Sequence, residues 1–348
     1  MKRFICLLTC TCVVLLLCSC ANKNAATQQS VPESQPVQSL ETTHSNQETE
    51  TQTEPVTEPE ATEPSQETNP TEPVTEVPTE PAPTEPPAPI STPVVLELSR
   101  YSYTVTDPGN TRGLSVEGYG FSYGVAKDGV PHNQSVINQQ TFDAFDHVQA
   151  LALDTQTQEK IMYLTFDNGY EYENLTADIL DTLKEKGVKA AFFVTLSYVK
   201  QNPQLVQRMI DEGHIVGNHS STHPSFPKLD RVAMAQEIAT LDNYLRENFG
   251  YSSPYFRFPS GEYSECALEL VTAIGFRSIF WSAAYADWDT TTQKGADYAF
   301  STVTSRFHPG AVILLHAVSQ DNADALGRII DEARNQGYSF ATLDSYSY

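Results

Sequence analysis

Residues 163–171 read YLTFDNGYE, an apolar run that stops at Asp167, Asn168 and Gly169. A short apolar run bounded by a glycine is typical of a buried strand. In folds built from parallel strands, the side chains at the carboxyl ends of the strands carry the chemistry. The stretch therefore predicts a buried strand that delivers Asp167 to a polar site.

Short apolar segments of the same kind recur after this strand, and segments with helical periodicity separate them. Two of the predicted helices, residues 176–186 and 230–249, end at Gly187 and Gly250, as helices commonly do. Strands that alternate with helices predict parallel βα units, and a barrel of about seven strands is favoured over an open doubly wound sheet. The predicted strands are residues 161–166, 190–195, 215–218, 255–258, 277–281, 312–315 and 340–343.

The N-terminal segment starts with Lys2 and Arg3 and continues with an apolar run, which is typical of a secretory signal peptide. The run ends in LCSC at residues 17–20, which resembles a bacterial lipobox. We therefore expect a lipoprotein signal peptide over residues 1–19, with Cys20 as the lipidated residue. A plain membrane-anchor helix is the alternative interpretation.

Residues 20–94 consist mainly of Thr, Glu, Pro, Gln and Ser, with near-repeats such as TEPVTEPEATEP. This composition lacks the apolar side chains that a packed core requires, so we expect a disordered acidic linker. The net charge of −23 comes from the linker and from the rest of the chain alike, which argues against a nucleic-acid partner. Residues 95–157 are predicted to be an irregular lead-in packed on the barrel, and residues 158–348 to be the barrel domain.

Some chemically versatile residues lie away from the predicted strand ends. Five of the 6 cysteines lie in the N-terminal segment, so Cys266 has no disulfide partner in the folded part. It falls in an apolar helical pattern and is predicted to be a buried core residue. Four histidines, namely His132, His147, His214 and His308, are predicted to be surface or capping residues.

Ionisable side chains follow most of the predicted strands. The segment HSSTH places His219 and His223 one helical turn apart, and this spacing suits zinc or another borderline divalent ion. Alone the pattern is a weak signal, but a carboxylate and a third histidine at other strand ends strengthen it. The other groups at strand ends are Arg257, Asp287 and His316.

These residue types supply the three parts that a hydrolysis requires. A metal ion on His219 and His223 would polarise a carbonyl and bind water. Asp167 is placed to accept a proton from that water, and His316 is placed to protonate a departing amine. The constellation therefore predicts a metal-assisted hydrolase.

Five motifs resemble, in the same order, those of the polysaccharide deacetylases of carbohydrate esterase family four, the NodB-homology domain. The motifs are TFDNG at 165–169, HSSTH at 219–223, RFPSG at 257–261, Asp287-Trp288, and LLH at 314–316. The resemblance covers about residues 155–345. It implies a distorted (β/α)7 barrel that removes acetyl groups from N-acetylated sugars. It also implies one divalent metal ion, with zinc expected first and cobalt or manganese as alternatives.

Carried over position by position, the resemblance implies that Asp167 is the catalytic base and that His316 is the general acid. His219 and His223 would bind the metal ion. The family's usual second aspartate, also a metal ligand, is Asn168 in this chain. An amide oxygen still coordinates a metal ion but brings no charge, so coordination by Asn168 is one interpretation. The other is that Asn168 only shapes the turn.

The resemblance also implies supporting roles around these groups. Arg257 would orient the base, and Asp287 would tune the acid. The backbone N–H of Ser260 would join the metal ion in holding the oxyanion of the tetrahedral intermediate. Trp288 and Leu314 would form walls of the acetyl pocket.

The asparagine followed by GYE resembles one branch of the family, the deacetylases of N-acetylmuramic acid in peptidoglycan that begin δ-lactam synthesis. We therefore expect peptidoglycan strands as the partner, and a monomer that meets the membrane only through its lipid anchor. The expected location is the outer face of the bacterial cell membrane, with reach into the wall. Two alternatives stay open: deacetylation of N-acetylglucosamine in peptidoglycan or chitin-like glycans, and a non-catalytic lipoprotein that binds the wall or a metal ion.

Overall fold

The computed structural model describes residues 89–348. The predicted signal peptide, the lipidated Cys20 and nearly all of the predicted linker fall on residues 1–88, outside the described residues, so they stay predictions. Within residues 89–348, no helix is both long enough and apolar enough to cross a membrane.

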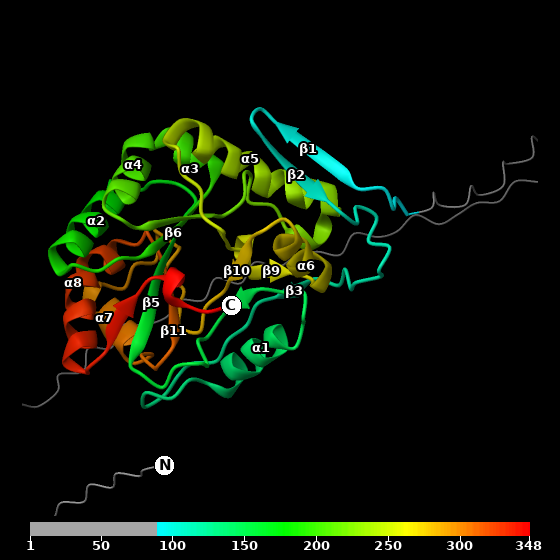
Figure 1. Cartoon of the computed structure of the whole chain (residues 1–348). Coiled ribbons are helices and arrows are strands. Elements are labelled where there is room, and N and C mark those ends of the chain that lie inside the picture. The colour runs from blue at the N-terminus through cyan, green and yellow to red at the C-terminus, as the bar shows by residue number, and fades with distance from the viewer. Residues whose placement is uncertain (1–88) are drawn as a thin grey trace, which may run out of the picture. The chain divides into compact units, whose positions relative to one another are not determined.

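The described part is built on a strongly curled sheet of parallel strands (Figure 1). The strand order is β11-β5-β6-β7-β8-β10-β4, and β12 pairs with the beginning of β5. All seven strands predicted from the sequence are present, and β4 adds a short strand at one edge. The bounds are β4 Ala150–Leu151, β5 Ile161–Asn168, β6 Ala191–Val194, β7 Ile215–Asn218, β8 Tyr255–Phe256, β10 Arg277–Ile279, β11 Ala311–His316 and β12 Ser339–Ala341.

The segment that follows β10 closes the curled sheet against β11. The backbone N–H of Ser282 donates to the carbonyl of Val312 at 3.0 Å, and the N–H of Leu314 donates to the carbonyl of Ala283 at 2.9 Å. These few bonds make a barrel that is irregular at its seam. The predicted distorted barrel of βα units is thereby confirmed, and an open doubly wound sheet is not what forms.

Helices surround the sheet and connect its strands (Figure 1). The predicted end signals operate as expected: the side chain of Asp230 caps α5, and Gly187 and Gly250 end α2 and α5 at φ values of 62° and 61°. Helices α1, α3 and α7 were not predicted. The bounds are α1 Asn133–Asp143, α2 Leu175–Lys186, α3 Leu196–Gln201, α4 Pro203–Asp211, α5 Arg231–Phe249, α6 Glu265–Ala273, α7 Ala296–Thr304 and α8 Gln320–Asn335.

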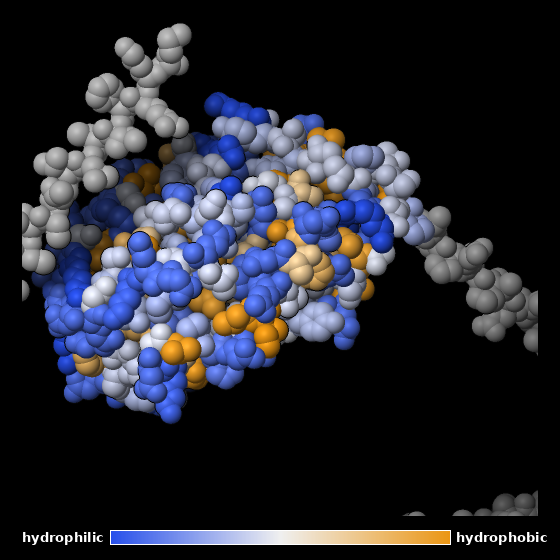
Figure 2. Space-filling view, turned by 60° about the horizontal axis from the view of Figure 1, so that its bottom comes forward, coloured by the Kyte–Doolittle hydropathy of each residue, from blue (hydrophilic) through white to orange (hydrophobic). Residues whose placement is uncertain are grey.

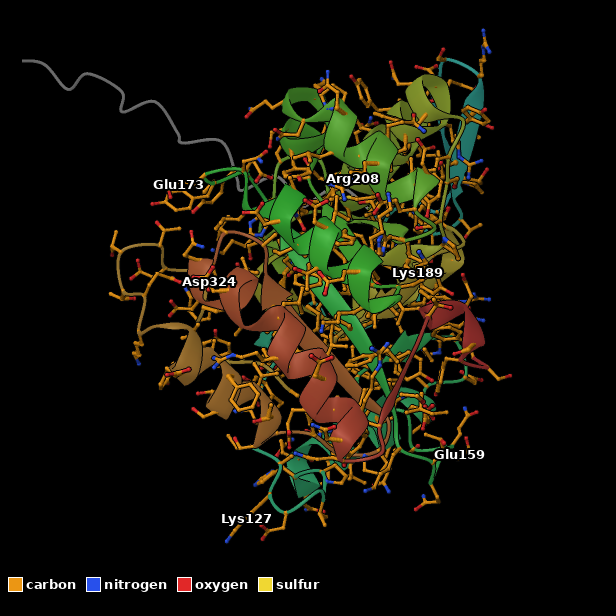
Figure 3. All side chains as sticks on the ribbon, turned by 90° about the vertical axis from the view of Figure 1, so that its left-hand side faces the viewer. Lys127, Glu159, Glu173, Lys189, Arg208 and Asp324 are labelled. Carbon is orange, nitrogen blue, oxygen red and sulfur yellow. The ribbon has the colours of Figure 1, made fainter. Side chains whose placement is uncertain are left out.

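Strand β5 is buried on both faces, which explains its nearly continuous apolar sequence. Met162, Leu164 and Phe166 pack in one cluster with α2, whereas Tyr163 packs in the cluster that fills the barrel. Because successive side chains alternate between faces, Asp167 follows Tyr163 to the inside of the barrel. Figure 3 shows Glu159, which precedes β5, and Glu173, which follows it, at opposite ends of the molecule.

The lead-in is more regular than predicted. It contains an antiparallel hairpin of β1 Val94–Leu98 and β2 Tyr101–Val105, followed by α1 and β4. The two-residue strand β3 Tyr119–Gly120 pairs with β9 Glu262–Tyr263, directly after the RFPSG motif. The hairpin packs on α5, where Tyr103 donates its hydroxyl to Asp242. The sequence does not reveal these elements, because they are short and depend on contacts with the barrel, and most of the segment between them lies outside helices and strands.

The face drawn in Figure 2 carries hydrophobic residues as separate spots among hydrophilic ones. Several large exposed side chains belong to the lead-in, among them Val116, Tyr119 and Val130. Two others, Tyr170 and Trp288, follow residues predicted to act in the site.

Candidate active site

The ion pair between Asp167 and Arg257 is the centre of the candidate site. Nη1 of Arg257 donates to Oδ1 of Asp167 at 2.7 Å, and the arginine side chain is completely buried. Its other donors are also satisfied, because Nη2 donates to Oγ1 of Thr165 at 2.9 Å and Nε to the carbonyl of Ile279 at 3.0 Å. The guanidinium lies 4.1 Å from the ring centroid of Phe193. Arg257 is therefore fixed, and it fixes Asp167.

The charge of Asp167 follows from this pairing. Burial is the largest single effect and raises the pKa of this carboxyl group, but the positive charge of Arg257, the contributions of His219 and His316, and the hydrogen bond from Arg257 together outweigh it. The pKa of Asp167 therefore lies below its ordinary value. Near neutral pH the side chain is an ionised proton acceptor at the mouth of the barrel.

The two histidines of HSSTH lie next to Asp167. The ring centroids of His219 and His223 are 4.9 Å apart, and Nε2 of His219 is 3.6 Å from Oδ2 of Asp167. Nδ1 of His219 lies 2.8 Å from the carbonyl of Arg257, so this nitrogen carries the proton and Nε2 keeps its lone pair. Burial lowers the pKa of His219 to about 4, which keeps the ring neutral and able to bind a metal ion.

Several residues around the site hold a left-handed backbone without being glycine. Ser220 and His223 have φ values of 66° and 60°, and Ser260 has a φ of 54°. Side chains disfavour this conformation, so surrounding contacts must hold it. Oγ of Ser220 accepts the N–H of His223 at 2.9 Å, and the carboxylate of Glu237 accepts both donors of Thr222 at 2.8 Å. The loop that presents His223 is thus braced.

Asn168 ends β5 beside Asp167 and is fully buried. Its Nδ2 lies 3.2 Å from Oγ1 of Thr176, whereas its Oδ1 has no hydrogen-bond partner. A buried acceptor without a partner costs free energy, and such sites call for an explanation such as a bound ion or water. The strand register places Asn168 level with Asn218, the residue before His219, across β6.

On the other side of Asp167, β11 ends at His316. Nδ1 of His316 lies 2.7 Å from Oδ1 of Asp287, and its backbone N–H donates to Oδ2 of Asp287 at 2.8 Å. Burial lowers the pKa of a histidine, but the negative charge of Asp287 and its hydrogen bond outweigh this effect, and Asp167 adds to it. The pKa of His316 is therefore raised, and the ring is available as a proton donor.

The remaining predicted site residues lie around these pairs. The ring of Trp288 meets the ring of His316 at an angle of 63° with centroids 5.8 Å apart, and the indole is 57% exposed. Leu314 is buried two residues before His316 on β11. Ser260 lies in a short turn after Arg257, and Gly261 next to it leaves room for the ring of Trp281, because an added Cβ would come within 2.8 Å of that ring.

Two predictions about the other histidines are wrong. His214 and His308 are buried rather than on the surface. Nδ1 of His214 accepts the N–H of Ala190 at 3.1 Å, and Nε2 of His308 lies 3.0 Å from Oγ of Ser282. Burial lowers the pKa of both, so they are neutral structural residues. Cys266 is buried as predicted.

Within residues 89–348, no three His, Cys, Asp or Glu side chains gather closely enough to hold a metal ion. The candidate donors are therefore the imidazoles of His219 and His223 together with the amide oxygen of Asn168. Sequence reasoning identified these residues but missed Thr165, which orients Arg257. The signal was present, because Thr165 is a polar residue inside an otherwise apolar strand.

Comparison with known proteins gives the site its context. The family model described as polysaccharide deacetylase matches residues 154–279. The peptidoglycan-N-acetylmuramic acid deacetylase PdaA of Bacillus subtilis is 42% identical over 193 residues, which are 55% of this chain and 73% of that protein. The chain belongs to the polysaccharide deacetylase family. A second relative in this family, a peptidoglycan-N-acetylglucosamine deacetylase of Bacillus cereus, is 35% identical over 186 residues, which are 52% of this chain and 66% of that protein.

The fold agrees with this assignment to the polysaccharide deacetylases. The solved structure of Bacillus subtilis PdaA, described as a family 4 carbohydrate esterase, matches with a TM-score of 0.63 and 37% identity. The match covers 66% of this chain and 97% of that chain. The predicted family, fold and class of enzyme are confirmed.

Proposed function

We propose that this polysaccharide deacetylase removes N-acetyl groups from peptidoglycan with the help of one divalent metal ion, and that its sugar is N-acetylmuramic acid. The observation that carries the reaction is the position of Asp167, an ionised carboxylate that has His316 level with it on the neighbouring strand β11 and the imidazole of His219, beside that of His223, within 3.6 Å of its Oδ2. The muramic acid assignment is supported by PdaA, the more similar of the two peptidoglycan deacetylases.

The residues present fit a divalent ion. His219 keeps the lone pair of Nε2 free, His223 is exposed beside it, and Oδ1 of Asn168 is a buried acceptor without a partner. Two imidazoles and one oxygen donor suit zinc, and cobalt or manganese are the alternatives. When bound, the ion supplies Lewis-acid polarisation of the acetyl carbonyl and lowers the pKa of water.

The chain's own residues then carry the protons. Asp167, held ionised by Arg257, accepts a proton from the attacking water as the new C–O bond forms. The backbone N–H of Ser260 donates to the oxygen on which negative charge develops. His316, held protonated by Asp287, gives its proton to the sugar nitrogen as the C–N bond breaks. Acetate and a free amine leave, and proton exchange with solvent resets both groups.

Trp288 and Leu314 are proposed to shape the acetyl pocket beside these groups. Trp288 lies against His316, the proposed proton donor, so a methyl group held there would have its carbonyl carbon between the acid and the base. A pocket of this kind would favour acetyl over larger acyl groups.

The test uses the purified full chain on intact and stem-stripped peptidoglycan, followed by mass analysis of the released muropeptides. We expect loss of acetyl groups on muramic acid, abolished by a chelator and restored by a divalent ion. Loss on glucosamine instead would favour the second candidate, an N-acetylglucosamine deacetylase, which the Bacillus cereus relative supports. Loss on neither sugar would contradict the proposal.

We also propose that the enzyme acts outside the cell membrane, with Cys20 lipidated and residues 20–94 as a linker toward the wall. The charged start, the apolar run and the LCSC sequence support this location. A Cys20→Ala chain expressed in a bacterium should no longer incorporate labelled fatty acid. Incorporation that persists in this variant would contradict lipidation at Cys20.

A further inference from the structure

Asp287, the partner of His316, is itself held by a second buried layer. The residue is 3% exposed, and the two oxygens of its carboxylate have different hydrogen-bond partners. Oδ1 faces Nδ1 of His316, whereas Oδ2 accepts both the backbone N–H of His316 and Nδ2 of Asn322, the latter at 2.6 Å. The side-chain amide of Asn322 therefore fixes the rotation of the Asp287 carboxylate.

Asn322 is in turn oriented by Tyr285. The hydroxyl of Tyr285 donates to Oδ1 of Asn322 at 2.6 Å, and both side chains are buried. A tyrosine hydroxyl that donates to Oδ1 leaves the NH2 group of Asn322 to face the carboxylate, since an amide has one acceptor side and one donor side. Tyr285 therefore donates to Asn322, and Asn322 donates to Asp287, which in turn faces His316.

The element that carries Asn322 is fastened to the loop after β10. Ser319 caps α8, and its Oγ lies 3.0 Å from Oε1 of Gln293. Oδ2 of Asp321 accepts the N–H groups of Lys294 and Gly295 at 2.6 and 2.8 Å. Figure 3 shows Asp324, near the start of α8, at the same end of the molecule as Glu173. The first turn of α8 therefore lies where the carboxyl ends of the strands deliver the site.

We infer that Asn322 and Tyr285 are positioning residues for the proton donor: they hold Asp287 in the orientation in which one carboxylate oxygen faces His316. The inference rests on the proposed function insofar as His316 donates the proton. Neither residue belongs to the five motifs, and neither contacts the groups that would bind the metal ion.

A loss of this positioning would change the pKa of His316, because that pKa depends on the charges that face the ring. They are Asp287 from the loop after β10, Asp167 from β5 and Arg257 from the segment after β8. Burial and Arg257 lower the pKa of His316, and the two carboxylates raise it. If Asp287 turns away, burial is no longer offset, and the pKa of His316 falls.

The experiment compares three variants of the full chain. Asn322→Leu removes the amide with little change of volume, and Tyr285→Phe removes one hydroxyl. Tyr163→Phe is the matched control, since its hydroxyl also makes a buried bond, to Oδ2 of Asp154 at 2.8 Å, inside the barrel and away from α8. Deacetylation is measured against pH with saturating metal ion, and thermal unfolding is recorded for each variant.

We expect kcat of Asn322→Leu to fall about 10- to 100-fold with little change in KM, the range seen when outer-layer partners of a site are removed. The basic limb of the pH profile should move to lower pH. Tyr285→Phe should shift the same limb by less, and it keeps the test decisive if Asn322→Leu does not fold. Tyr163→Phe should lower the melting temperature without moving the limb.

A titration followed by NMR separates this inference from the proposed reaction. Metal-free full chain with labelled histidine reports the pKa of His316 directly, with His316→Ala to assign the signal, and needs no turnover. A lower pKa of His316 in Asn322→Leu or Tyr285→Phe supports positioning even if peptidoglycan is not the substrate. An unchanged pKa and an unchanged basic limb, with only a lower melting temperature, would reduce both residues to ordinary structural contacts.

Discussion

The site contains two pairs of a carboxylate and a cationic side chain, and the two pairs differ in which member is buried. In the pair Asp167–Arg257 the cation is completely buried and the carboxylate is 8% exposed, whereas in the pair His316–Asp287 the carboxylate is completely buried and the histidine is 23% exposed. In each pair the fully buried member supports the member that is open to the site. The fold thus lowers the pKa of Asp167 and raises that of His316, the proposed base and acid, by burying a different partner in each pair.

The largest effect is expected from removing Asp167, the proposed base. Asp167→Asn keeps an acceptor for Arg257 but has no charge to take up a proton, so activity should fall roughly 10²- to 10⁴-fold. Muropeptide mass analysis measures the loss, and metal analysis of the pure variant is the control. Activity near the wild-type level would show that another group is the base, and it would contradict the role given to the Asp167–Arg257 pair.

Removing His316, the proposed acid, should slow turnover to a similar extent but should leave metal binding unchanged. His316→Ala should slow deacetylation by about 10²- to 10⁴-fold while metal content stays as in the wild type. By contrast, His219→Ala or His223→Ala should abolish metal binding and activity together. A loss of metal ion from His316→Ala would show that the two sides of the site are not separate.

Removing the cationic side chain should cost the two pairs different amounts of stability. Arg257→Met leaves the Asp167 carboxylate buried without its partner, which typically costs about 3–5 kcal/mol. Denaturant unfolding with tryptophan fluorescence measures this cost. The matched variant is His316→Ala, in which Asp287 keeps the donor of Asn322, so its loss of unfolding free energy should be clearly smaller. Equal losses would contradict the described asymmetry.

The pH dependence of the wild type sharpens the comparison. As the proposed base, Asp167 must be ionised, and its pKa is lowered, so the acid limb should lie below the ordinary range of an aspartate when metal ion is saturating. As the proposed acid, His316 must be protonated, and its pKa is raised, so activity should be lost only above the ordinary value of a histidine. An acid limb of kcat/KM at the ordinary pKa of an aspartate would contradict the lowered pKa of Asp167. A basic limb at the ordinary pKa of a histidine would contradict the raised pKa of His316.

The smallest effect is expected at Asn168. Asn168→Asp adds a charged oxygen where an acceptor now has no partner, so metal ion should be retained more tightly during dialysis against a chelator. The acid and basic limbs of the pH profile, assigned to Asp167 and His316, should stay at the same pH. Unchanged retention would favour the interpretation that Asn168 only shapes the turn after β5.

The sequence predicts the barrel, and which polar residues lie at its strand ends, because both depend on local signals. Apolar runs, helix-ending glycines and polar residues at strand ends are visible in one stretch at a time. The hairpin of β1 and β2 cannot be predicted in this way, because its short strands are stabilised by contacts with α5. Helix α1 is almost as polar on one face as on the other, so periodicity does not reveal it.

The buried histidines and the layer behind Asp287 escape prediction for a related reason. His308 is paired with Ser282, and Asn322 with Asp287, across 26 and 35 residues of sequence. The residues next to His308 or Asn322 in the sequence do not indicate such a partner. A polar residue in this position looks like a surface residue until the fold brings the partner to it.

The pairing of β5 has a consequence for the order in which the molecule assembles. Thr165 bonds to Ile313, a residue 148 positions later, and the beginning of β5 pairs with β12 near the end of the chain. Contacts over such separations are slow to form because the intervening chain must first be organised. During synthesis, β5 can pair early with β6, but its other edge waits for β11 and β12 near the end of the chain. Folding intermediates should therefore expose that edge of β5, which is a template for aggregation until β11 and β12 cover it.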